Sequence, residues 1–108
     1  MVIINKKMSS KKVLQYSFES KLWKYKGEKG WYFLTLSKEL SRLIKKNHFS
    51  SEEGWGRLRV TCNMGRSVWS TAIWYDSKFE AYLLPIKIAV RKKEGVEEGD
   101  ILKCSLKI

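Results

Sequence analysis

Residues 57–64 alternate strictly between apolar and polar side chains, a pattern that leaves few alternatives to a β-strand. The apolar positions, which would share one buried face, are Leu58, Val60, Cys62 and Met64. Successive side chains of a strand point to opposite faces, so the intervening Arg57 and Arg59 are expected to face solvent. Gly65 then indicates a tight turn, and residues 67–75 return as a second strand. The pattern predicts a β-hairpin with one buried face.

Other segments extend this β-rich pattern. In residues 13–25 the apolar phase shifts near Leu22, which predicts a long strand with a bulge or bend. Residues 31–36 are apolar on both faces, and residues 81–84 and 101–108 are further strand candidates that follow turn residues. Six or seven short strands of this kind are typical of a small barrel.

Two helices are expected between the strands. Ser37 is predicted to cap the first helix, and residues 47–53 after it are predicted to be a polar loop. The apolar residues at helical spacing are Leu36, Leu40, Leu43 and Ile44. Pro85 suits the first turn of a second helix over residues 86–93, and Gly95 suits the position just past its end. A continued strand is the alternative there, because the apolar residues also alternate.

These elements predict a mainly β fold, a small closed or partly open barrel of six or seven strands with two short helices. We expect a mixed strand order, because each helix can carry a crossover. A length of 108 residues fits one domain, which we place at residues 13–108 after a flexible basic segment at residues 1–12. That segment lacks the apolar run of a signal peptide, and no window reaches the length of a membrane span. We therefore expect a cytoplasmic protein without membrane contact.

The strongest signal in the composition is charge. The chain has 22 Lys and Arg residues against 11 Asp and Glu residues, which gives a net charge of +11. Such a field attracts polyanions and can support nucleic-acid binding. The alternative is that lysines coat every solvent face, because they are spread along the whole chain. Nucleic-acid binding therefore stays one of two interpretations of the charge.

No catalytic or metal motif is visible in the sequence. The single histidine, His48, falls in the predicted loop, where solvation is its simplest role, and zinc sites need further ligands at set spacings. There is no nucleophile elbow, Walker loop or dinucleotide fingerprint. Cys62 and Cys104 lie on apolar faces of predicted strands, which favours buried reduced thiols over a disulfide or a reactive thiol. We predict no cofactor, no metal and no catalytic residue, with an enzyme completed by a partner left as an alternative.

Two clusters are candidate ligand-binding sites. Their residues are Trp55, Arg57, Arg59, Trp69, Lys87 and Arg91. The two tryptophans could stack on bases or other rings while the neighbouring arginines bind phosphates, although tryptophan also fills barrel cores. The last two residues are four positions apart and would share one face of the predicted second helix. That face is either an anion site or a solvated basic surface.

Several blocks of the sequence match a known family. They are Gly54-Trp55-Gly56-Arg57-Leu58-Arg59-Val60, Trp69-Ser70-Thr71, and Leu84-Pro85-Ile86-Lys87 with Gly99-Asp100. On these blocks the chain resembles the domain of unknown function family 1905 over nearly all of residues 14–108. It departs from the family at Ser37, where proline is common, and at Ala72, where serine is frequent. The resemblance implies a small bacterial or archaeal β-barrel, sometimes joined to a second domain, and it implies no function.

A shorter resemblance involves the last quarter of the chain. Pro85, Gly95 and Gly99-Asp100 before an alternating strand are similar to the core of AbrB-type swapped-hairpin transcription regulators. Those proteins pair into dimers and bind DNA, but an analogy of fold carries no function by itself. The leading hypothesis is a non-enzymatic module that binds an anionic or aromatic ligand or a protein partner, as a monomer or homodimer. A nucleic-acid-binding protein of the swapped-hairpin barrel type is the alternative.

Overall fold

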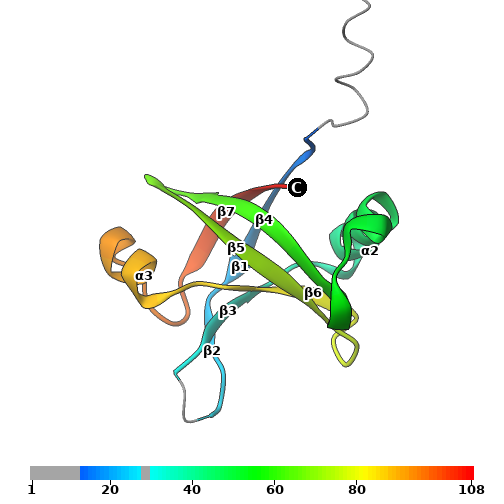
Figure 1. Cartoon of the computed structure of the whole chain (residues 1–108). Helices are drawn as coiled ribbons and strands as arrows, with labels where there is room; N and C mark the ends of the chain where they lie inside the picture. The colour runs from blue at the N-terminus through cyan, green and yellow to red at the C-terminus, as the bar shows by residue number, and fades with distance from the viewer. Residues whose placement is uncertain (1–12, 28–29) are drawn as a thin grey trace, which may run out of the picture.

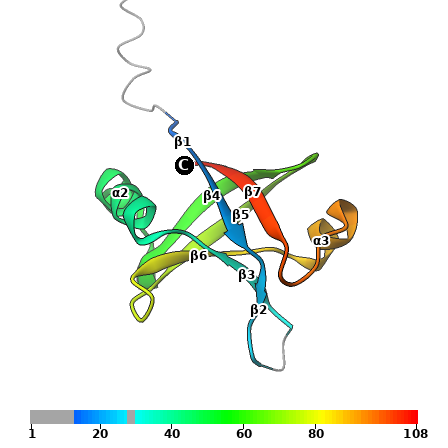
Figure 2. The same ribbon diagram turned by 180° about the vertical axis from the view of Figure 1, so that it is seen from behind.

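A computed structural model describes residues 13–27 and 30–108 of the chain. The flexible basic segment predicted at residues 1–12 lies outside the described residues. Within the described part, a curved sheet lies between two helices on opposite sides (Figure 1). Figure 2 gives the same arrangement from behind.

Seven antiparallel strands form this sheet in the described residues. They are β1 (Gln15–Lys21), β2 (Trp23–Lys24), β3 (Tyr32–Thr35), β4 (Arg57–Met64), β5 (Ser67–Asp76), β6 (Ala81–Pro85) and β7 (Ile101–Lys107). Their spatial order is β1-β7-β4-β5-β6-β3-β2. The two outermost strands, β1 and β2, are separated in sequence by Leu22 alone, so the sheet curls toward itself as a half-barrel. This confirms the predicted mainly β fold and the bend in the first strand.

The β4–β5 hairpin places one row of side chains in the core. The predicted strand over residues 57–64 has the same bounds as β4, and its apolar positions are buried while Arg59 is exposed. In the register of the hairpin, Arg57 lies opposite Trp74 and Arg59 lies opposite Ala72. The two arginines therefore share the outer face of the sheet, because they are two positions apart on one strand.

Each helix carries a crossover. Helix α2 (Lys38–His48) joins β3 to β4, and α3 (Ile88–Glu94) joins β6 to β7, so both helices connect strands that are not neighbours. Ser37 caps α2 as predicted, since its side chain accepts a hydrogen bond from the Leu40 N–H at 3.0 Å. The crossovers give the mixed strand order that was predicted, although every strand pair in the described residues is antiparallel.

The C-terminal half of α2 differs from the prediction. The helix continues through His48 into a short 3₁₀ turn, η1 (Phe49–Ser51), where a polar loop was expected. Leu43 is 47% exposed, and the buried face of the helix is made by Ser41, Ile44 and His48. Ser41 is inward because its hydroxyl accepts a hydrogen bond from the Tyr82 N–H of β6 at 3.0 Å. Contacts with distant strands, and not helical spacing of apolar residues, select the buried face.

The second helix begins later than predicted. Pro85 ends β6, and α3 starts three residues further on with Lys87 as its N-cap. The β3–β6 ladder holds this segment extended, because Pro85 lies opposite Phe33 and the Ile86 N–H bonds to the Tyr32 carbonyl at 2.9 Å. Proline fits the end of the strand because it has no N–H to donate.

The end of α3 is fixed against the β4–β5 turn. Gly95 follows the helix with φ of +64°, a left-handed conformation that ends helices and favours glycine. The Glu94 carboxylate accepts hydrogen bonds from the Arg66 N–H at 3.1 Å and the Ser67 hydroxyl at 2.5 Å. A Cβ on Gly65 would collide with this carboxylate. Glycine at position 65 therefore permits both the turn and the approach of the helix.

Both cysteines, Cys62 and Cys104, are buried and free, which is the arrangement that the sequence favours. The hydrogen bond that the Cys62 thiol donates to the Cys104 sulfur, together with burial, raises the pKa of Cys62. A raised pKa keeps the thiol protonated and weakens it as a nucleophile. None of the helices in the described residues has the length and apolar character needed to cross a membrane.

Candidate functional site

A cleft of about 780 Å³ lies where β6 turns away from β5, and we call it the basic cleft. The two strands are paired only over residues 74–76 of β5 and 81–83 of β6. Beyond this point β6 follows β3 and leads into α3, so the middle of β5 faces α3 across the cleft. Residues Ser70, Thr71 and Ala72 line the β5 side.

Cationic side chains enter the basic cleft from β2, β4, and α3 with its N-cap. They are Lys24 of β2, Arg57 and Arg59 of β4, Lys87 before α3, and Arg91 of α3. No acidic residue is among the described side chains that line the cleft. The cleft is therefore a concave surface with a strong positive charge.

The structure brings five of the six predicted ligand-binding residues to this cleft. Arg57, Arg59, Trp69, Lys87 and Arg91 all line it, although they come from the β4–β5 hairpin and from the separate α3 segment. The sixth residue, Trp55, has its backbone in the 3₁₀ turn η2 (Gly54–Gly56), and its side chain lies outside the described part of the structure.

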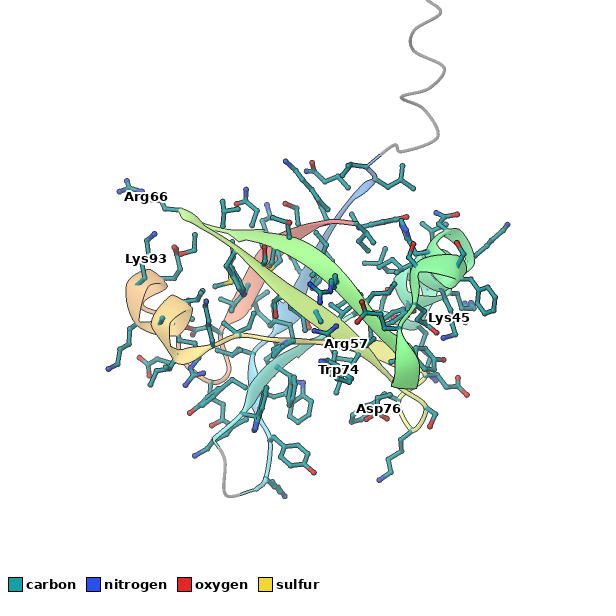
Figure 3. The ribbon with its side chains drawn as sticks, in the orientation of Figure 1. Lys45, Arg57, Arg66, Trp74, Asp76 and Lys93 are labelled. Carbon is teal, nitrogen blue, oxygen red and sulfur yellow. The ribbon has the colours of Figure 1, made fainter. Side chains whose placement is uncertain are left out.

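The Glu53 carboxylate positions the arginines on the β4 side of the cleft. Glu53 accepts hydrogen bonds from Arg57 Nη1 and, at 3.3 Å, from Arg59 Nε. The hydrogen bond from Arg57, with smaller effects from Arg59, lowers the pKa of Glu53. The guanidinium carbon of Arg57 also lies 5.5 Å from the ring centroid of Trp74 (Figure 3). Glu53 therefore holds both arginines and offsets one of their two positive charges.

The α3 wall is organised by a stacked arginine. The Arg91 guanidinium carbon lies 3.8 Å from the centroid of the Tyr32 ring, and its Nη1 donates to the Ile86 carbonyl at 2.7 Å. Such stacking fixes a guanidinium without neutralising it. Lys87 is the exposed N-cap of α3, and its carbonyl accepts a hydrogen bond from the Arg91 N–H at 3.1 Å. The two residues are therefore one helical turn apart, and both line the α3 side of the cleft.

The aromatic residues differ in exposure. Trp69 is 9% exposed and belongs to the hydrophobic core. It therefore fills the interior of the sheet, which is the alternative to ligand stacking that the sequence left open. Trp31 and Trp74 are 50% and 40% exposed at the rim of the cleft. Trp31 and Tyr32 were not singled out from the sequence, because residues 31–36 looked buried on both faces. Alternation along β5 indicates that Trp74 faces outward, because it is adjacent to the buried Ile73.

A second polar cluster connects α2 to β6. Glu52 accepts hydrogen bonds from the Tyr82 hydroxyl at 2.7 Å and from Lys45 Nζ at 2.9 Å, and Lys45 lies 4.2 Å from the ring centroid of Tyr75. Burial acts to raise the pKa of Glu52, but the two hydrogen bonds outweigh it and the pKa is lowered. Burial and Glu52 together raise the pKa of Tyr82. Both groups are held more firmly in their ordinary protonation states, which suits a structural link and not proton transfer.

The described residues contain no group of three or more His, Cys, Asp or Glu side chains placed to hold a metal ion. Comparison with curated proteins finds no match for the chain. The basic cleft lies within residues 24–91, and a family match extends over residues 18–106, which is most of the chain. On that match, the chain belongs to the family described as Domain of unknown function (DUF1905).

Proposed function

We propose that the chain is a non-enzymatic binding module whose basic cleft takes a small anionic ligand carrying a planar ring, of the nucleotide class. The observation that carries this proposal is the convergence of cationic side chains beside two exposed tryptophans, with no acidic residue among the described lining residues. Arginine and lysine bind phosphate through charge-assisted hydrogen bonds, and exposed tryptophan rings stack on planar groups.

The size and the chemistry of the cleft support this ligand class. A volume of about 780 Å³ falls in the range of small-molecule sites. Arg91 and Arg57 are fixed in advance by Tyr32 and Glu53, so less side-chain freedom is lost when an anion binds. Ser70 and Thr71 line the cleft without a histidine or carboxylate among the described lining residues to activate them as nucleophiles. Binding without covalent chemistry is the activity that this residue set favours.

The proposal is tested by titration calorimetry and tryptophan fluorescence with AMP, ATP, adenosine and inorganic pyrophosphate. We expect the nucleotides to bind more tightly than either adenosine or pyrophosphate, because only they use both the cations and the rings. Lys87→Glu is expected to weaken ATP binding by about ten- to a hundredfold, the range of a lost hydrogen bond to a charged group.

Lys92→Glu is the matched control for Lys87→Glu. Lys92 is an exposed lysine of α3 that does not line the cleft, so its reversal makes the same change in net charge. We expect this control to alter ATP affinity by less than about threefold at physiological salt, where charges beyond about 8 Å are screened. Absence of nucleotide binding, or equal loss in the two variants, would contradict the proposed function.

A further inference from the structure

A second hollow lies on the outer face of the same sheet, and we call it the aromatic groove. Six aromatic side chains among the described residues line it: Trp23, Tyr25, Trp31, Phe33, Trp74 and Phe79. Its volume is about 710 Å³. Tyr25, Trp31 and Phe79 are 52%, 50% and 44% exposed. Large apolar side chains clustered in solvent generally mark a binding surface.

The rings of the groove are held by one another. Trp31 stacks on Phe33 with centroids 5.9 Å apart and planes 9° apart, and Trp23 packs against Phe33 at 5.3 Å and against Phe79 at 6.1 Å. Trp23 is further fixed by a hydrogen bond from its Nε1 to the Thr35 hydroxyl at 2.8 Å. The groove is thus a preformed set of ring faces and not a collapsed core, since its outer rings keep about half of their surface exposed.

The aromatic groove and the basic cleft are continuous. Lys24, Trp31 and Trp74 line both hollows, so a ligand could pass from one to the other along the outer face of the sheet. Lys26 and Lys78 line the groove, and Asp76 is the one acidic residue among its described lining residues. The combined surface alternates ring faces with positive charges.

We propose that this continuous surface binds single-stranded nucleic acid, with phosphates along the lysines and arginines and unpaired bases stacked on the aromatic groove. The inference rests on the proposed binding of phosphates in the basic cleft. Single-strand binding sites combine a positive path for the backbone with ring faces for successive bases. Duplexes keep their bases stacked internally, so they lack the groups that the groove would take.

Charge favours single-stranded nucleic acid over the other ligands that an aromatic surface can bind. A second copy of the chain would bring a net charge of +11 against another +11, which opposes association through a lysine-lined face. A neutral oligosaccharide could stack on the rings but would leave the cations of the adjoining cleft unused. A polyanion with planar groups is complementary to both parts.

The test is fluorescence anisotropy with labelled dT12, rU12 and a 12-base-pair duplex at several salt concentrations. Seven basic residues among the described side chains line the two hollows: Lys24, Lys26, Arg57, Arg59, Lys78, Lys87 and Arg91. If each meets a phosphate of a single strand, log K against log salt has a slope of about −5, and Arg59→Glu reduces its magnitude by about 0.7. Single strands are expected to bind at least tenfold more tightly than the duplex.

Phe79→Ala separates the groove from the cleft, because Phe79 lines only the groove. We expect it to weaken dT12 binding by about 5- to 150-fold, the range for one lost stacking ring, and to leave ATP binding unchanged. Tyr25→Ala, at another exposed ring of the groove alone, should act in the same direction. Phe49→Ala is the matched control, since Phe49 is 71% exposed and lines neither hollow.

Each other outcome overturns the inference in a recognisable way. If ATP binds but dT12 binds no more tightly than a mononucleotide, the inference fails while the proposed function stands. If neither ligand binds, both fail. If single strand and duplex bind with equal affinity, the surface binds a duplex and the inference fails. If sedimentation shows that Phe79→Ala changes the oligomeric mass of the protein, the groove binds a second copy of the chain and the inference also fails.

Discussion

At the scale of single residues, His48 couples stability to pH. Its Nε2 is 2.9 Å from the Tyr16 hydroxyl, which also accepts a hydrogen bond from Asn47 Nδ2 at 3.0 Å. Burial lowers the pKa of His48 below 6.5, so the unfolded chain takes up a proton at a higher pH than the native protein. The unfolded state then binds more protons as the pH falls, and native stability decreases below about pH 6.5.

We therefore expect the free energy of unfolding in urea to fall between pH 6.5 and pH 5, by no more than about 1.4 kcal/mol per pH unit. His48 is the only histidine of the chain, so His48→Gln should flatten this part of the profile. An unchanged profile in His48→Gln would assign the dependence to other groups.

The environment of His48 illustrates why single residues were hard to place from sequence. Solvation was the simplest role for a lone histidine in a polar loop, and it was wrong, because the partner Tyr16 is 32 positions earlier in the chain. The same reason applies to Trp69 and Trp74. Alternation places them on opposite faces but does not tell which face is covered, and the structure buries Trp69 and leaves Trp74 exposed at the rim of the cleft.

At the scale of elements, α3 depends on one carboxylate for its attachment to the β4–β5 turn. Glu94→Ala removes the acceptor for the Arg66 N–H and for the hydroxyl of Ser67, which is 4% exposed. We expect a loss of about 1–3 kcal/mol in the free energy of unfolding, measured by urea denaturation, because a buried hydroxyl loses its partner.

Glu98→Ala is the control for this prediction. Glu98 is an exposed glutamate in the turn after α3, so its removal changes the charge equally and should alter stability by less than about 0.5 kcal/mol. Equal effects of the two substitutions would mean that charge, and not the attachment of the helix, determines stability here.

Elements were predictable where their pattern is local. The alternation in β4, the bend at Leu22 and the cap at Ser37 each depend on neighbouring residues, and each was located correctly. The start of α3 was wrong because Pro85 fits both a helix start and a strand end. The choice is made by pairing with Phe33, more than fifty positions earlier, which no local pattern contains.

At the scale of the whole molecule, the candidate site follows from strand order. β4 and α3 are far apart in the sequence, and they meet because β5 is paired with β6 over only three residues and then diverges. The basic residues were identified from their types and spacing, but their meeting in one cleft requires the order β4-β5-β6-β3. Tyr32 joins the site through that same order, and Lys24 joins it through β2, the strand next to β3.

The net charge of +11 leads to a prediction for the whole molecule. Mutual repulsion among the excess cations destabilises the compact state, and salt screens it. We expect the free energy of unfolding to rise by roughly 1 kcal/mol between 20 and 300 mM NaCl, equivalent to about 4–8 °C in Tm. The double variant Lys21→Glu/Lys107→Glu, at two exposed strand positions outside both hollows, should reduce this dependence.

Salt should have the opposite effect on ligand binding, because phosphate contacts weaken as counterions compete for them. The opposite effects of salt on stability and on binding distinguish charges that are spread over the surface from charges that form the binding site. Lys21→Glu/Lys107→Glu is expected to change the salt dependence of stability and leave that of dT12 binding almost unaltered, whereas Arg59→Glu should change the slope for binding. If the double variant instead lowered both dependences equally, the positive field would act as a whole, and the basic cleft would have no special role in recognition.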